Sequence, residues 1–229
     1  MGTTCDRGNL SPINIYPGTY SDANGVEPIH IRNDGEKPKV TIRGVEFAGR
    51  DFDSLEPVDN TPPENLNLFR LHFGALASCK FAFEMGISVV LNNRECAGVL
   101  QVTLTLGDPK PNGALDKEVL VLQLGWEGQS VCSSGKSGWF EDELLEIQGA
   151  LPQGAFIKSC INCLYSDYSP IGHGLFGTMM CFRNIKEQYL AVRTKDDFFE
   201  VQDHHDRMVQ ETFLCSDFTR RVPGTGYRG

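Results

Sequence analysis

Positive charge and long apolar runs are both scarce in this sequence. Its 229 residues hold 21 lysines and arginines against 30 aspartates and glutamates, which gives a net charge of −9. A surface of that sign repels phosphate backbones and anionic lipids, so it argues against nucleic acid and membranes as partners and suits a basic protein. No apolar stretch is long enough to span a bilayer, and the first residues lack the apolar segment of a secretory signal. We therefore expect a cytoplasmic protein whose eight cysteines are thiols or metal ligands and not disulfides.

Common catalytic templates are also absent from the sequence. It contains no G-x-S-x-G, no Walker loop, no H-E-x-x-H, and no G-x-G-x-x-G that follows a strand. Strand and helix patterns do not alternate, which argues against a parallel nucleotide-binding sheet. No class of reaction therefore follows from a motif.

Alternation with a period of two residues is the strongest pattern that the sequence does contain. In "CKFAFEMGISVVL" the apolar side chains fall on the odd positions from Cys79 to Leu91, and "VLQVTLTL" alternates in the same way up to Leu106. The turn residues of "NNRECAG" separate the two segments. This pattern predicts a long antiparallel hairpin with one buried face that includes Phe83, and a bulge or bend at Gly86.

Shorter alternating segments predict further strands at residues 39–47, 69–73, 118–126 and 155–164. Helical spacing is limited to residues 137–152, residues 182–192 and a segment that begins at Thr194, where Asp197 occupies the capping-box position. We predict a mainly β protein: an antiparallel β-sandwich with a cysteine-rich α/β C-terminal section. Residues 1–150 would form the sandwich and residues 151–229 the section packed on it, or the two would form one single domain.

Four cysteines in the last third have spacings that suit a metal. Cys160 and Cys163 form a C-x-x-C pair, and Cys181 and Cys215 follow. Four thiolates can form the tetrahedral cage that Zn²⁺ prefers, so a structural zinc site is one interpretation. Buried reduced thiols that pack as small apolar side chains are the second, and a redox C-x-x-C pair is the third. We expect the four cysteines to lie close together whether or not zinc is bound.

The loop that begins at Cys160 also carries polar side chains that could bind a ligand. These candidate binding residues are Ser166, Asp167, His173 and Arg183. A Ser–His–Asp set requires its members to converge in space, which local sequence does not show. A tight turn between the glycines that flank His173 is the alternative without chemistry.

Two C-terminal segments carry a family resemblance. "CINCLYSDYSPIGHGLFGTMMCFRN" and "VQETFLCSDFTRRVPGTGYRG" resemble an uncharacterised bacterial domain-of-unknown-function family with a C-x-x-C-x-Y-S-x-Y loop and a C-terminal G-Y-R-G tail. The resemblance covers the last third well and the strand region only loosely. It implies that the cysteine loop and the tail belong together, and it implies no reaction. The positions that match are Cys160, Cys163, Tyr165, Ser166, Tyr168, Gly174, Phe176, Gly177, Cys181, Phe182, Arg183, Cys215, Arg221, Gly226, Tyr227 and Arg228.

Three functional hypotheses follow from these observations. The first is a non-catalytic binding or interaction protein of unknown partner, of an immunity or adaptor type, with a structural zinc site. The second is a hydrolase or transferase with its site in the loop at residues 160–183. The third is a thiol redox sensor. A pocket lined by Asp167, His173 and Arg183 would favour the enzyme.

Overall fold

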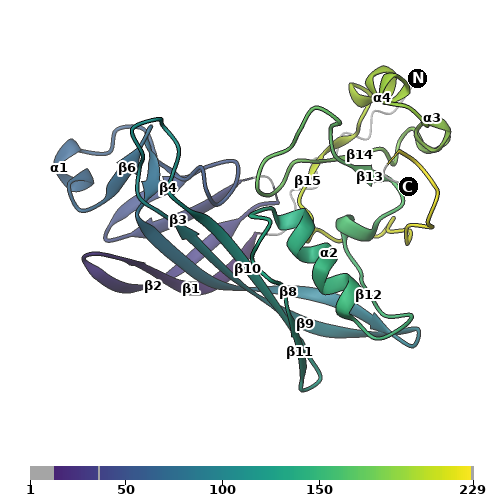
Figure 1. Cartoon of the computed structure of the whole chain (residues 1–229), viewed down its shortest axis with the longest axis horizontal. Coiled ribbons are helices and arrows are strands. Elements are labelled where there is room, and N and C mark those ends of the chain that lie inside the picture. Colours follow the sequence, from purple (N-terminus) through teal and green to yellow (C-terminus); the bar gives the residue numbers. More distant parts are fainter. Residues whose placement is uncertain (1–12, 36, 228–229) are drawn as a thin grey trace, which may run out of the picture.

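The protein is mainly β, and all of its sheets are antiparallel and open. The structure, a computed structural model, describes residues 13–35 and 37–227. One ten-stranded sheet dominates, with the order β11-β10-β9-β8-β1-β2-β3-β4-β5 and with β12 paired to β8 (Figure 1). Two small sheets, β6-β7 and β13-β14-β15, accompany it.

The large sheet consists of β1 (Asn14–Asp22), β2 (Gly25–Asn33), β3 (Pro38–Ile42), β4 (Val45–Ala48), β5 (Glu56–Pro57), β8 (Cys79–Leu91), β9 (Arg94–Leu106), β10 (Glu118–Trp126), β11 (Gln129–Cys132) and β12 (Phe156–Ile157). The small sheets consist of β6 (Arg70–His72), β7 (Ala75–Ala77), β13 (Ser166–Asp167), β14 (Met179–Cys181) and β15 (Arg207–Val209). The helices are α1 (Pro63–Leu66), α2 (Phe140–Ala150), the 3₁₀ helix η1 (Cys160–Asn162), α3 (Lys186–Ala191) and α4 (Lys195–Gln202).

The long hairpin expected from the alternation is confirmed as β8 and β9. Their register runs without interruption from the pair Cys79–Leu106 to the pair Leu91–Arg94. Asn92 and Asn93 form the turn between them with φ angles of 48° and 63°, the left-handed conformation that suits the twist of a two-residue hairpin. The expected bulge at Gly86 is wrong, because Gly86 pairs directly with Val99 in this register.

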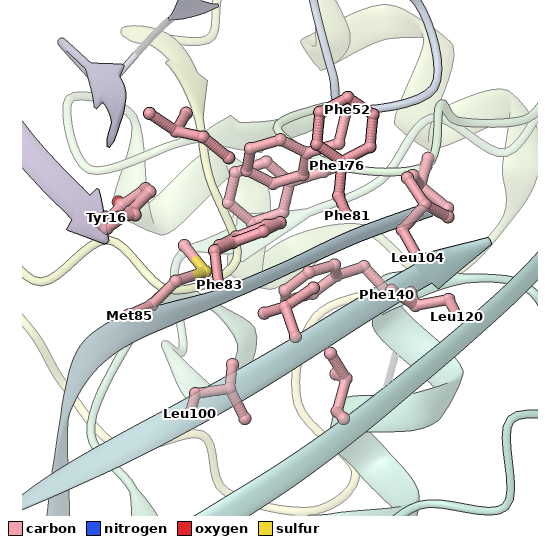
Figure 2. Packing of buried hydrophobic residues seen from close by; sticks show 14 of the residues in the cluster. Tyr16, Phe52, Phe81, Phe83, Met85, Leu100, Leu104, Leu120, Phe140 and Phe176 are labelled. Carbon is pink, nitrogen blue, oxygen red and sulfur yellow. The ribbon is translucent and has the colours of Figure 1, made fainter. Parts of the chain in front are cut away.

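The inner face of the large sheet is the main hydrophobic core (Figure 2). Phe83 on β8 is 3% exposed and its ring lies 4.7 Å from that of Phe52, which in turn stacks at 5.0 Å on Phe176. Phe176 also lies 4.6 Å from Phe140, the first residue of α2. Helix α2 and two loops therefore cover this face, and a second sheet packed in a sandwich is not confirmed.

Strand β1 leaves β8 soon after the two strands meet. Their pairing extends only from Ser21–Lys80 to Gly18–Phe83. A Cβ on Gly18 would lie 2.3 Å from the carbonyl oxygen of Ala82, so only glycine allows this close approach. The next residue outward, Pro17, has no N–H to continue the ladder. A gap therefore opens between β1 and β8, and the same edge of β8 is paired again only by β12, at Val89 and Val90.

The C-terminal third departs further from the expected elements. The strand expected at residues 155–164 is limited to β12, because the side chain of Asn162 donates to the carbonyl of Ile157 and a 3₁₀ turn follows. The segment around Cys215 forms no strand: residues 213–215 have no regular secondary structure and lie between turns at residues 211–212 and 216–217. Helix α4 is confirmed together with its capping box, in which Thr194 and Asp197 bond reciprocally. A separate α/β section is not established. No helix within residues 13–35 and 37–227 has the length and apolar character needed to cross a membrane.

Candidate functional site

Ser166 and Asp167 form the short strand β13, and both are buried. The Ser166 hydroxyl donates to the carbonyl of Cys160. The carboxylate of Asp167 accepts from the hydroxyl of Tyr189 at 2.8 Å and from the N–H of Tyr168 at 2.9 Å. Both side chains thus hold the C-terminal segments together.

His173 and Arg183 have different partners. The Nε2 atom of His173 lies 3.3 Å from a carboxylate oxygen of Glu141, and its ring packs 4.5 Å from that of Tyr168. The Nε atom of Arg183 lies 2.7 Å from Asp206. Asp167 and His173 thus both contact Tyr168, whereas Ser166 and Arg183 have partners elsewhere. Of the four predicted binding residues, Arg183 is the one that lines the groove described below.

The four cysteines expected to cluster are neighbours. Burial raises the pKa of the Cys160 thiol most, and the nearby thiols of Cys163, Cys181 and Cys215 raise it further. However, the described parts of the chain hold no group of three or more histidine, cysteine, aspartate or glutamate side chains that could hold a metal ion. The structure therefore does not support a zinc site at these cysteines. Cys160, Cys163 and Cys181 are buried and Cys215 is half-buried, which agrees with the interpretation as packed thiols.

A buried carboxyl group lies beside the cysteine loop. Glu211 is fully buried, and its carboxylate accepts from the N–H of Gly177 at 2.8 Å and the hydroxyl of Tyr168 at 2.9 Å. Burial raises the pKa of Glu211 to about 7, and the neighbouring Glu141 adds to this rise. The side chain anchors the segment after β15 to the loop that carries Gly177.

A large groove opens where β1 separates from β8. It has a volume of about 810 Å³, within the range of ligand-binding pockets. Strand β1 contributes Ile15 and Tyr16, and β8 contributes the residues from Gly86 to Ser88. The opposite wall consists of Arg183, Arg207, Gln210 and residues 212–216. The sheet and the C-terminal segment thus form the groove together.

Arg207 contributes a positive charge to this groove. Its guanidinium lies 4.7 Å from the centre of the Phe213 ring, and its Nε atom is buried without a hydrogen-bond partner. No carboxylate in the described ranges forms an ion pair with it, whereas Arg183 is paired with Asp206 and Asp217. A buried unpaired donor costs about 1–3 kcal/mol. An anionic ligand would remove this cost, because guanidinium groups bind carboxylates and phosphates through two hydrogen bonds.

Sequence reasoning missed this site. Arg207 lies in the unpatterned segment "DHHDRMVQETF", which has no motif or periodicity. The groove depends on Gln210, whose side chain exchanges two hydrogen bonds of 2.9 Å with that of Asn33, 177 residues earlier. The one available signal was a proline and a glycine together in a strand pattern, Pro17 and Gly18, which often marks an interrupted ladder.

Comparison with known protein families gives one match. The model of a family of unknown function, DUF6304, matches residues 14–166. The chain belongs to DUF6304. This confirms membership of an uncharacterised domain family. The matched residues of this DUF6304 protein cover the large sheet and end at Ser166, whereas the resemblance above rested on the C-terminal third. No curated protein and no solved structure matches it.

Proposed function

We propose that this DUF6304 protein is a non-catalytic binding protein, of an immunity or adaptor type, and that its partner binds in the groove between β1, β8 and residues 207–216. The observation that carries the proposal is Arg207, a cation that lines this groove and whose buried Nε atom has no hydrogen-bond partner among the described residues. Four buried side-chain atoms in the described ranges have no hydrogen-bond partner, those of Ser159, Asp206, Arg207 and Arg221, and Arg207 is the one of these residues that lines the groove.

The partners of the loop residues favour binding over catalysis. An enzyme site in the loop would need a pocket lined by Asp167, His173 and Arg183, and the large groove includes only Arg183. The Ser166 hydroxyl donates to the backbone carbonyls of Cys160 and Cys163, and a backbone carbonyl cannot serve as the general base of a nucleophile. A general base must lie within hydrogen-bond reach of the nucleophile that it activates.

The net charge and the free thiols bear on the partner and on the location of the protein. The net charge of −9 suits a partner that is basic overall, while Arg207 would contact an acidic group on it. The seven cysteines within the described ranges are all free, which suits a reducing cytoplasm.

Site-specific crosslinking tests the proposal. A photoreactive amino acid at Thr212 lies in the groove, and one at Val26, which is 73% exposed and lies outside the groove lining, serves as the control. In cells that make the protein, we expect a partner to be crosslinked from position 212 and not from position 26. The partner should then bind the purified protein.

Removing the cation should weaken this interaction. Arg207→Gln is expected to lower the affinity of the purified partner about tenfold, which corresponds to the loss of one charge-assisted hydrogen-bond pair. Arg94→Gln removes an exposed arginine that is paired with Glu127 and should leave the affinity unchanged. Equal crosslinking from both positions, or equal affinity of both variants, would contradict the proposal.

A further inference from the structure

We propose that the partner enters the groove as an extended peptide that adds a strand to the open edge of β8, with an aspartate or glutamate side chain placed against Arg207. This inference rests on the proposed function and names the kind of partner. It follows from the backbone groups at the gap between β1 and β8.

The direction of these backbone groups follows from the pairing of β8. In an antiparallel strand, successive residues direct their N–H and C=O groups to opposite neighbours. The carbonyl of Ser88 accepts from the N–H of Lys158, just beyond β12, at 2.8 Å. The backbone N–H and C=O groups of the even-numbered residues of β8 therefore point toward β1 and β12, and those of the odd-numbered residues point toward β9. The N–H and C=O of Gly86 thus point into the gap, as does the carbonyl of Glu84.

No strand in the described ranges occupies this part of the edge. Pairing with β1 ends at Phe83, and pairing with β12 begins at Val89. The carbonyl of Glu84 faces Pro17, which has no N–H to donate. A Cβ added at Gly86 would meet no atom within 4 Å, so the space above the strand is open there. Unpaired strand edges of this kind are templates for another strand.

The opposite side of the gap presents a second edge. Backbone direction alternates along β1, so the odd-numbered residues Ile15 and Pro17 present their backbone to the gap, while Tyr16 and Gly18 present theirs to β2. Because β1 and β8 are antiparallel, an inserted strand would run parallel to one of them and antiparallel to the other. Ile15, which is 50% exposed, and Phe213 supply apolar surface for its side chains.

Charge determines which peptide fits best. Arg207 stacks on Phe213 beside the gap and has no acidic partner in the described ranges, while Glu95 at the rim is already paired with Lys158 at 2.5 Å. A peptide carboxylate can accept two hydrogen bonds from a guanidinium. A peptide with a lysine at the same position would leave Arg207 unpaired and would be repelled by it.

A displayed library of random eight-residue peptides, selected on the whole protein, tests the proposal. We expect enriched peptides to carry an aspartate or glutamate, and replacement of that residue by its amide to lower the affinity about tenfold. Two synthetic peptides test the backbone pairing, one methylated on its odd-numbered nitrogens and one on its even-numbered nitrogens. Methylation of at least one of these sets should lower the affinity about tenfold, because a paired strand directs alternate N–H groups to each neighbour.

Two variants of the protein test whether the peptide pairs with the edge of β8. Gly86→Pro removes the N–H that faces the gap and leaves the pairs with β9 intact, and it should abolish binding. Val99→Ala, directly opposite Gly86 on β9 and outside the groove lining, should bind normally, and circular dichroism spectra of both variants should match that of the unmodified protein. Hydrogen exchange of the Gly86 amide, slowed by the peptide, provides a readout that needs no substitution.

The outcomes separate the two proposals. No enrichment of acidic peptides, or binding that is insensitive to backbone methylation and leaves exchange at Gly86 unchanged, would overturn strand addition. If the partner crosslinked at Thr212 still depends on Arg207 in that case, the binding function stands and the ligand enters the groove in another form. If that dependence also fails, both proposals fall.

Discussion

Burial controls the protonation of Glu211. The ordinary pKa of a glutamate is 4.5, and burial raises that of Glu211 to about 7, although three hydrogen bonds, from the backbone of Gly177, its own backbone and the side chain of Tyr168, act in the opposite direction. A folded state with the higher pKa binds the proton more tightly than the unfolded chain does. Glu211 therefore stabilises the fold most below about pH 4.5, and this contribution is lost as the pH rises to about 7.

The substitution Glu211→Gln should reveal this contribution. Between pH 4.5 and pH 7 the glutamate is expected to lower the free energy of unfolding by roughly 3 kcal/mol as the pH rises, and glutamine should remove this slope. Urea unfolding at pH 5 and pH 7.5 measures the difference between the two proteins. Glu187→Gln, at an exposed site on α3, is the control. An unchanged pH slope in Glu211→Gln would show that the carboxyl group titrates normally.

At the scale of single elements, the β8–β9 hairpin carries the main core. Phe83 contacts Phe52 at 4.7 Å and Tyr16 at 6.1 Å, measured between ring centres. Phe83→Ala should lower the free energy of unfolding by about 3–5 kcal/mol, as expected for a large truncation in a core. Glu84→Ala, one residue further on the exposed face, should change it by less than about 0.5 kcal/mol. Chemical denaturation of the two variants gives the comparison, and similar values would mean that the buried face is wrongly assigned.

Elements with a strong local pattern could be predicted from the sequence. The hairpin follows from alternation across 28 residues that are adjacent in the chain, from Cys79 to Leu106. Helix α4 follows from the local pair Thr194 and Asp197. The segment at residues 155–164 alternates as a strand does, but the tertiary bonds of Asn162 turn it into a 3₁₀ helix after Ile157.

The candidate site could be predicted only in small part. The proximity of Cys160 and Cys163 follows from their local C-x-x-C spacing, and Arg183, a predicted binding residue, lines the groove. The groove itself depends on three segments that are far apart in the chain, represented by Ile15, Gly86 and Arg207. Nothing in the local pattern of these residues indicates that they meet, because their proximity arises from strand order and from the path of the C-terminal segment.

At the scale of the whole molecule, contacts cross the expected boundary at residue 150. One hydrophobic cluster includes Phe83 and Leu104 from the sheet as well as Phe176 and Val209 from the C-terminal third. Asn33 and Gln210, which are 0% and 3% exposed, form a reciprocal amide pair across the same boundary. We therefore expect residues 13–227 to unfold as one cooperative unit.

A double-mutant cycle on this amide pair tests the connection. Asn33→Ala and Gln210→Ala should each lower the free energy of unfolding by about 2 kcal/mol, because each leaves a buried amide without its partner. The double variant should lose about 1–2 kcal/mol less than the sum. Tryptophan fluorescence and far-ultraviolet circular dichroism should report the same midpoint in urea. Additive losses, or two separate midpoints, would show that the two regions are independent.

The path of residues 207–216 has a consequence for biosynthesis. A ribosome releases β1 and β8 well before it releases Arg207 and Gln210, so the growing chain can form most of the large sheet while one wall of the groove is still missing. During that interval the apolar surface around Ile87, which the C-terminal segment later walls in, is open to other nascent chains, and exposed apolar surface in an incomplete fold leads to aggregation. Arrival of the C-terminal segment ends this interval, so the segment that shapes the binding groove also protects the newly made protein from its neighbours.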